Sequence, residues 1–121
     1  MTDPIADALK LQLDAAAQGF DWRQADELWP KLAEEIAELR EAAGQGPDRI
    51  RDELGDLLFM AVNLARHLGV DPAAALAGSN EKFRRRFGHV CRHRDRWAPE
   101  GDPSRLESME ALWQEAKQLG L

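Results

Sequence analysis

Two charged segments joined by a short turn constrain the fold of this chain most strongly. Residues 31 to 56 read KLAEEIAELREAAGQGPDRIRDELGD. Apolar residues recur at helical spacing on both sides of GQGP, which predicts two amphipathic helices. Because the turn is short and contains glycine and proline, we expect the helices to fold back on each other as an antiparallel pair.

Each predicted helix carries acidic residues three positions apart. At about 100° per residue, Glu35 lies about 60° from the centre of the first apolar stripe, and Glu38 lies further round on the same side. Glu34 points almost directly away from that stripe. On the second helix Glu53 flanks the apolar stripe, and Asp56 is its neighbour three residues later. The pattern predicts two pairs of carboxylates converging beside one core.

Four carboxylates held together need a compensating charge. Two like charges about 4 Å apart repel by about 4 kcal/mol at an effective dielectric constant of 20. Shared protons or a hard divalent cation can relieve this repulsion, and oxygen-only ligands suit Mg²⁺ or Mn²⁺. The alternative is a set of ordinary solvated helix acids that form ion pairs with Lys31 and Arg49.

The same residues resemble a known family. EEIAE followed, after a short gap, by ELGD is similar to the paired EExxE and ExxD signature of the MazG nucleoside triphosphate pyrophosphohydrolases. The segments GFDW, ELGDLLFMAVNLARHLGVDP, NEKFRRRF and MEALWQEAK also resemble MazG sequences. The resemblance covers about residues 18 to 117, with both acid pairs and NEKFRRRF in the family's order.

The resemblance implies a fold and an assembly. We expect an all-α, MazG-like bundle of four to five helices that forms a single domain over residues 1–121. Some MazG proteins carry two such domains, and this chain resembles the catalytically competent C-terminal one. Apolar stripes on more than one helix face favour burial by helix pairing between subunits, as a homodimer or a dimer of dimers.

The resemblance also implies an activity. The chain is expected to hydrolyse nucleoside triphosphates to monophosphates and pyrophosphate, with a role in cleaning the nucleotide pool. On this analogy Mg²⁺, with Mn²⁺ as the alternative cation, is bound by Glu35, Glu38, Glu53 and Asp56. Either Glu38 or Glu35 would orient or deprotonate the attacking water.

Substrate contacts are expected elsewhere in the chain. Lys82 and Arg86 share a helix face at i, i+4 and match the family's phosphate-gripping pair, although charge runs are often only solvated surface. Asn63 lies about 10 Å beyond Asp56 along its helix, a nucleotide's length from the metal. Its alternative role is a buried amide that hydrogen-bonds to a neighbouring helix. Trp113 would cover the nucleotide on the family analogy, or belong to the core.

Two aromatic residues of GFDW leave a similar choice open. Phe20 and Trp22 either plug the end of the helix bundle or contact the nucleotide base. In MazG-like chains the residues before the first acidic helix line the base pocket, so the resemblance favours a nucleotide contact.

Composition limits the class of protein. The chain has 121 residues, a formal net charge of −6 and a single cysteine, Cys91. The net charge argues against a general binder of nucleic-acid polymers, and one cysteine cannot form an internal disulfide, which suits a reducing cytosol. We find no basic and apolar leader and no apolar run long enough to span a bilayer. These features predict a cytoplasmic protein that acts away from membranes.

Breaker residues predict where the helices begin and end. The expected helices span about residues 5–18, from 26–30 to 43–44, 48–67, 72–97 and 104–118. Gly19 and Gly69 are expected stop signals, and Asp71 before Pro72 an N-cap. Ser104 and Glu107 are expected to form a capping box for the last helix. No segment reads convincingly as a strand.

Other site chemistries fit less well. No glutamate has a histidine three residues later, as a ferritin-like di-iron site requires, and neither GxxxxGK[ST] nor GxGxxG occurs. On a helix Cys91 points about 160° away from His89 and His93, so these three residues are not expected to bind zinc. Two rival functions remain: a base-selective enzyme of the dUTPase or dCTPase kind, and a non-catalytic helical regulator or interaction module.

Overall fold

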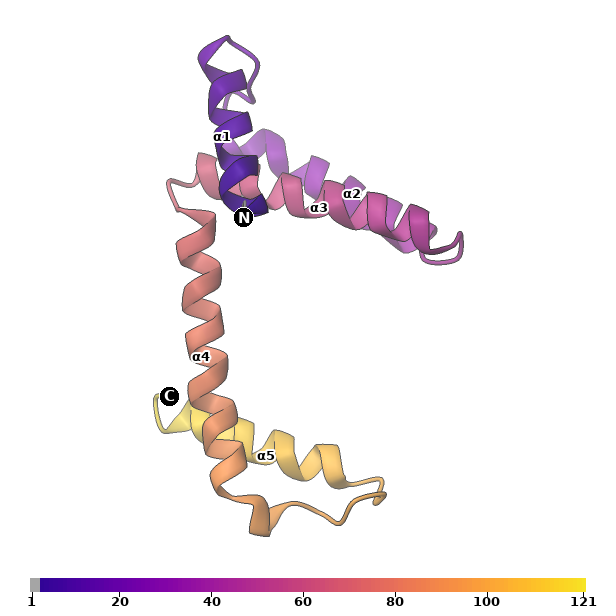
Figure 1. The fold of residues 1–121 in the computed structure, drawn as a ribbon, viewed down its shortest axis with the longest axis vertical. Coiled ribbons are helices and arrows are strands. Elements are labelled where there is room, and N and C mark those ends of the chain that lie inside the picture. The colour runs from indigo at the N-terminus through magenta and orange to yellow at the C-terminus, as the bar shows by residue number, and fades with distance from the viewer. Residues whose placement is uncertain (1–2) are drawn as a thin grey trace. The chain divides into compact units, whose positions relative to one another are not determined.

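The computed structural model describes residues 3–121, and within that range all the regular structure is helical. Five α-helices follow one another: α1 (Pro4–Ala17), α2 (Leu28–Ala42), α3 (Pro47–His67), α4 (Pro72–Arg92) and α5 (Arg105–Gln118). Two short 3₁₀ helices, η1 (Ala25–Glu27) and η2 (Arg94–Arg96), precede α2 and follow α4. The predicted all-α fold of four to five helices is therefore confirmed, with five (Figure 1).

The described chain forms two compact units. The first ends at Ala75, and the second is Leu76–Leu121, so the boundary falls inside α4. In the first unit α2 and α3 pack side by side as the predicted hairpin, and α1 packs against α3 (Figure 1). Gly46, with φ +99°, is the N-cap of α3, and Pro47 occupies its first turn, which explains why GQGP reverses the chain here.

The connection between α3 and α4 contains both predicted signals, a glycine that ends one helix and an aspartate that caps the next. Gly69 has φ +75°, and the amides of Gly69 and Val70 donate to the carbonyls of Arg66 and Ala65. This Schellman arrangement ends α3 and pairs carbonyls that a helix terminus otherwise leaves free. Asp71 then caps α4 by accepting from the amide of Ala73 at 3.3 Å.

Two predictions about the second unit were wrong. The helix expected to reach Trp97 ends at Arg92, and the indole of Trp97 turns back to donate to the carbonyl of Val90 at 3.0 Å. Ser104 is the N-cap position of α5 but makes no side-chain capping bond. Its hydroxyl donates instead to Asp102 at 2.7 Å, because a local side-chain turn competes with the expected capping box.

Two faces of α3 differ in burial within this chain. The apolar stripe, which was predicted to pair between subunits, is partly uncovered: Leu54 and Leu68 on that stripe are 42% and 53% exposed. The buried residues of α3 instead follow the polar seam beside the stripe: Glu53, Met60 and Asn63, together with Val62. Within this chain α3 therefore packs against the rest of the first unit through its partly polar seam, and much of its apolar stripe stays uncovered.

In the second unit α5 packs on the C-terminal part of α4 (Figure 1). Val90, Leu112 and Ala116 are almost completely buried there. Among residues 3–121 no helix is long and apolar enough to cross a membrane.

Candidate functional site

The hairpin of α2 and α3 brings three of the four predicted metal ligands together. Donor oxygens of Glu35, Glu38 and Glu53 lie within 4.8 Å of one another. Glu53 belongs to a second such group with Asp52 and Asp56, both of which are exposed. Asp56 therefore lies next to the cluster through Glu53, and Asp52 is an additional acid that the sequence analysis did not single out.

Burial makes this acid group unusual for a helix surface. Glu35 and Glu53 are only 7% and 6% exposed, whereas Glu34, predicted to point outward, is exposed and pairs with Lys31. The Oε2 atoms of Glu35 and Glu53 are buried and have no hydrogen-bond partner among the described residues. An unpaired buried carboxylate oxygen is costly in free energy. A partner that bound these two atoms would therefore stabilise the cluster.

The ion pairs expected of ordinary helix acids are also present. Arg49 pairs with Oε1 of Glu53 at 3.0 Å, and Lys31 lies 3.9 Å from Oε1 of Glu35. Burial raises the pKa of Glu53, Arg49 opposes this shift, and the nearby charges of Glu38 and Asp56 add to it. Each cation contacts Oε1, so both Oε2 atoms stay open to another cation.

A pocket of about 480 Å³ lies in the same unit. This volume is in the range of small-molecule sites. Phe20 and Trp22 from the connecting loop and Asn63 from α3 line it, together with Gln12 of α1 and Arg66 of α3. Phe20 is 82% exposed, so it is not a buried plug of the helix bundle.

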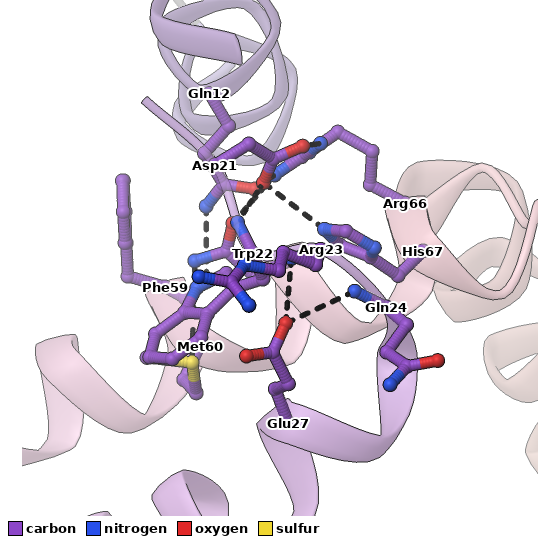
Figure 2. A network of polar contacts seen from close by, with 11 residues as sticks. Gln12, Asp21, Trp22, Arg23, Gln24, Glu27, Phe59, Met60, Arg66 and His67 are labelled. Carbon is purple, nitrogen blue, oxygen red and sulfur yellow. Dashed lines mark hydrogen bonds and ion pairs between the residues drawn. The ribbon is translucent and has the colours of Figure 1, made fainter. Parts of the chain in front are cut away.

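A polar network forms one wall of this pocket (Figure 2). Arg66 donates to both carboxylate oxygens of Asp21, at 2.8 and 2.7 Å, and His67 approaches the same carboxylate at 3.0 Å. Gln12 accepts from Arg66 at 3.5 Å and donates to the carbonyl of Phe59 at 3.0 Å. The network fixes the aromatic loop to α3 and to α1.

Asn63 takes part in this network through its oxygen. Its Oδ1 accepts from Arg66 at 2.9 Å, while its Nδ2 has only the sulfur of Met60 at 4.0 Å. These partners lie on α3 itself, not on a neighbouring helix as the structural alternative supposed. Asn63 therefore keeps an amide donor with only a weak partner on a residue that lines the pocket.

Sequence reasoning missed Gln12, Asp21 and Arg66. Their contacts join positions about 45 to 54 residues apart, which no local pattern reveals. The available signal was the polar seam of α3, because a buried polar seam needs partners from other elements.

The Asp21 ion pair gives a prediction about stability. The side-chain hydrogen bond from Arg66 holds the pKa of Asp21 well below its usual range. We expect Asp21→Asn to lower the free energy of unfolding at pH 7 by about 1–2 kcal/mol. Because the folded pKa is depressed, the difference from wild type persists above about pH 4 and declines as the pH falls through the folded pKa.

Urea unfolding at pH 7 and at pH 3 measures this effect. Asp14→Asn is the matched control, because Asp14 pairs with Lys10 on the exposed surface of α1 and should change stability little. Equal losses for Asp14→Asn and Asp21→Asn, or a loss at position 21 that does not change with pH, would contradict the assignment.

The remaining predicted residues lie in the second unit. Lys82 is exposed, and Arg86 is half-buried, donating from Nε to the carbonyl of Leu121 at 3.0 Å. The guanidinium of Arg86 lies over the Trp113 ring, 5.7 Å from its centroid, and Phe83 contacts the same ring at 5.4 Å. Trp113 is thus partly buried against α4 rather than fully in the core.

Comparison with known proteins identifies the family. The model of the MazG nucleotide pyrophosphohydrolase domain matches residues 23–91, more than half of the chain, including both acid pairs. The chain belongs to this MazG family. The match extends over α2, α3 and nearly all of α4 and so includes Asn63, Lys82 and Arg86.

Curated relatives of this MazG domain agree with the assignment. A protein of Escherichia coli K12 named nucleoside triphosphate pyrophosphohydrolase is 42% identical over 91% of this chain and 43% of its own length. A Thermotoga maritima protein named nucleoside triphosphate pyrophosphohydrolase/pyrophosphatase MazG is 36% identical over 95% of the chain and 46% of its own length. The uncharacterized protein YabN of Bacillus subtilis is 41% identical over 57% of the chain. The chain spans less than half the length of the first two relatives.

Proposed function

We propose that this MazG domain hydrolyses nucleoside triphosphates to the monophosphate and pyrophosphate, and that it needs Mg²⁺ to do so. The observation that carries the proposal is the acid cluster of α2 and α3. Two of its carboxylates, Glu35 and Glu53, are buried, each with an unpaired oxygen, and the helix α3 that carries Glu53 also lines a nucleoside-sized pocket. The names of the Escherichia coli and Thermotoga maritima relatives support the same activity.

The donor set fits a hard divalent cation. Glu35, Glu38 and Glu53 would hold it, with Asp56 from the adjoining group, and all four offer only carboxylate oxygens. Mg²⁺ prefers such ligands, and Mn²⁺ accepts them too. When bound, the cation supplies positive charge against the phosphate oxygens and favours deprotonation of water.

Side chains of the protein would have two further roles in the reaction, proton transfer and charge stabilisation. Glu38 or Glu35 would accept a proton from the water that attacks the α-phosphorus. The new bond forms from that water oxygen to phosphorus, and the bond from the α-phosphorus to the α,β-bridging oxygen breaks, releasing pyrophosphate. Lys82 and Arg86 would offset the negative charge on the departing pyrophosphate.

The pocket would hold the nucleoside. Phe20 and Trp22 offer aromatic faces on which a base can stack. The weakly partnered amide donor of Asn63 could bond to an acceptor atom on the base edge. Trp113 would help to cover the nucleotide. Because a fixed polar wall discriminates between hydrogen-bonding patterns, a base-selective enzyme of the dUTPase or dCTPase kind is the second candidate.

In a cell the proposed activity would remove unwanted nucleoside triphosphates from the cytoplasmic pool.

Pyrophosphate release from the eight common ribo- and deoxynucleoside triphosphates, with Mg²⁺ and with EDTA, tests the activity. Metal-dependent release that is lost in Glu38→Ala is the expected result. Similar rates with all bases indicate a broad house-cleaning enzyme, and one dominant substrate indicates a selective one. If a folded sample releases no pyrophosphate from common or modified nucleotides, the result favours the non-catalytic interaction module over the enzyme.

We also propose that the domain works as a homodimer or a dimer of dimers. Large apolar side chains along α2 and α3 are exposed, among them Ile36 (44%), Leu54 (42%) and Leu58 (60%). Exposed apolar surface of this kind is typical of interfaces. We expect light scattering after gel filtration to give a multiple of 13.6 kDa and Leu58→Glu to reduce it. A wild-type monomer at micromolar concentration would refute this assembly.

A further inference from the structure

The second unit holds a cluster of possible metal ligands that shares no residue with the acid cluster. His89 and His93 lie one turn apart near the end of α4, and Glu115 reaches them from α5. One donor atom of each lies within 4.8 Å of the other two. Nε2 of His89 is 3.6 Å from Oε1 of Glu115, and the two imidazole rings are 4.5 Å apart between centroids.

Each of the two histidines has a buried ring nitrogen without a hydrogen-bond partner among the described residues. His89 is only 6% exposed, and its Nε2 atom is buried without a hydrogen bond among the described residues; Nδ1 of His93 is also buried and unpaired. Buried polar atoms are nearly always paired, so two adjacent exceptions, both on possible ligands, indicate a missing partner.

We propose that His89, His93 and Glu115 bind a Zn²⁺ ion that links α4 to α5. Two imidazoles and one carboxylate form a common zinc donor set, with metal–ligand distances of about 2.0–2.2 Å. Ligand atoms on such an ion lie roughly 3.4 Å apart at a tetrahedral angle, so donors within 4.8 Å need only small side-chain rotations to converge. Water would complete the coordination.

A neighbouring arginine orients the carboxylate. Arg96 donates to Oε2 of Glu115 at 2.9 Å, which leaves Oε1 directed toward His89. Bonds of this kind to a ligand carboxylate are typical of metal sites. Cys91 is not part of the group, as its predicted direction on the helix implies, and the third ligand comes from α5, where sequence spacing gave no signal.

Ligand type separates this site from the acid cluster. Imidazole nitrogen binds Zn²⁺ well and Mg²⁺ poorly, whereas the acid cluster offers only oxygen. Excess Mg²⁺ should therefore occupy the acid cluster and leave the histidine site free for zinc. The inference does not depend on the proposed activity, because it concerns binding in the other unit.

Calorimetric titration of the full chain with ZnCl₂ in excess MgCl₂ tests the site. We expect one equivalent of zinc per chain, with affinity at least about tenfold weaker in His93→Ala and Glu115→Gln. The chain has three histidines, so His67→Ala, which removes the one outside the cluster, is the matched control. His67→Ala and Cys91→Ser should bind zinc as wild type does.

A second readout uses the wild-type protein alone. Zinc in excess Mg²⁺ should shift the ring-proton NMR signals of His89 and His93 and leave those of His67 unchanged, and it should raise the melting temperature. This measurement decides the question even if a variant fails to fold. The site is refuted if wild type binds no zinc under these conditions, if folded His93→Ala and Glu115→Gln bind it fully, or if only the His67 signals move.

Discussion

The Glu53→Gln variant is expected to lose metal-dependent pyrophosphate release by at least about 10²–10³-fold, equivalent to roughly 3–4 kcal/mol of transition-state stabilisation. Glutamine keeps the shape of Glu53 but removes the charge and one oxygen of a buried carboxylate at the centre of the cluster. Initial rates at saturating Mg²⁺ measure the loss. Glu34→Gln is the matched control: Glu34 is exposed, pairs with Lys31, and should keep near-wild-type activity.

The same substitution should affect stability in the opposite direction. Burial raises the pKa of Glu53, so its charge opposes folding when no metal is bound. Glu53→Gln should therefore be more stable than wild type in EDTA at pH 7. Because the folded pKa lies above the unfolded one, this advantage should shrink as the pH falls toward the unfolded pKa. An active Glu53→Gln enzyme, or one destabilised in EDTA, would contradict the assignment of Glu53 to the metal centre.

Lys82→Ala and Arg86→Ala are expected to reduce kcat/KM by about 10- to 100-fold each, the loss of one charge-assisted contact of about 1.5–3 kcal/mol. Lys82 is exposed, so its substitution should leave stability unchanged. Arg86 also packs on Trp113, so Arg86→Ala is to be compared with wild type by thermal unfolding as well as by kinetics.

Arg84 provides the matched control for this pair. It lies on the same helix but pairs with Glu81 on the exposed surface. Arg84→Ala should therefore keep its kcat/KM. Equal effects at positions 82, 84 and 86 would point to a diffuse field of positive charge instead of a specific phosphate contact.

The features predicted best from the sequence depend on local signals. GQGP, Gly69 and Asp71-Pro72 each fix a turn or a cap within a few residues, and the structure confirms all three. Helical periodicity also predicted that Glu35 lies inward and Glu34 outward, because the direction of a side chain on a helix depends only on its position.

Features that depend on competing or distant partners were predicted less well. The hydroxyl of Ser104 can either cap α5 or bond to Asp102, and in the structure it bonds to Asp102. Trp97 was assigned to α4 on pattern alone, whereas its indole bonds back to the carbonyl of Val90. The link from Arg66 to Asp21 and the contact of Glu115 with His89 join elements that only the tertiary fold brings together.

The hydrophobic pattern leaves one question open. Periodicity identifies an apolar stripe but not which chain covers it, and within this chain the buried residues of α3 lie mainly on the polar seam. Glu53 of the acid cluster and Asn63 both lie on this seam, so the face of α3 that packs within the first unit also carries residues of the candidate site.

The fate of the oxygen of the attacking water tests the central claim most directly. Hydrolysis of a preferred nucleoside triphosphate in ¹⁸O-labelled water with Mg²⁺, followed by ³¹P NMR, identifies the products and the labelled phosphorus. Attack at the α-phosphorus predicts unlabelled pyrophosphate and a monophosphate carrying ¹⁸O. Orthophosphate with a nucleoside diphosphate, or label in the pyrophosphate, would contradict the proposed reaction.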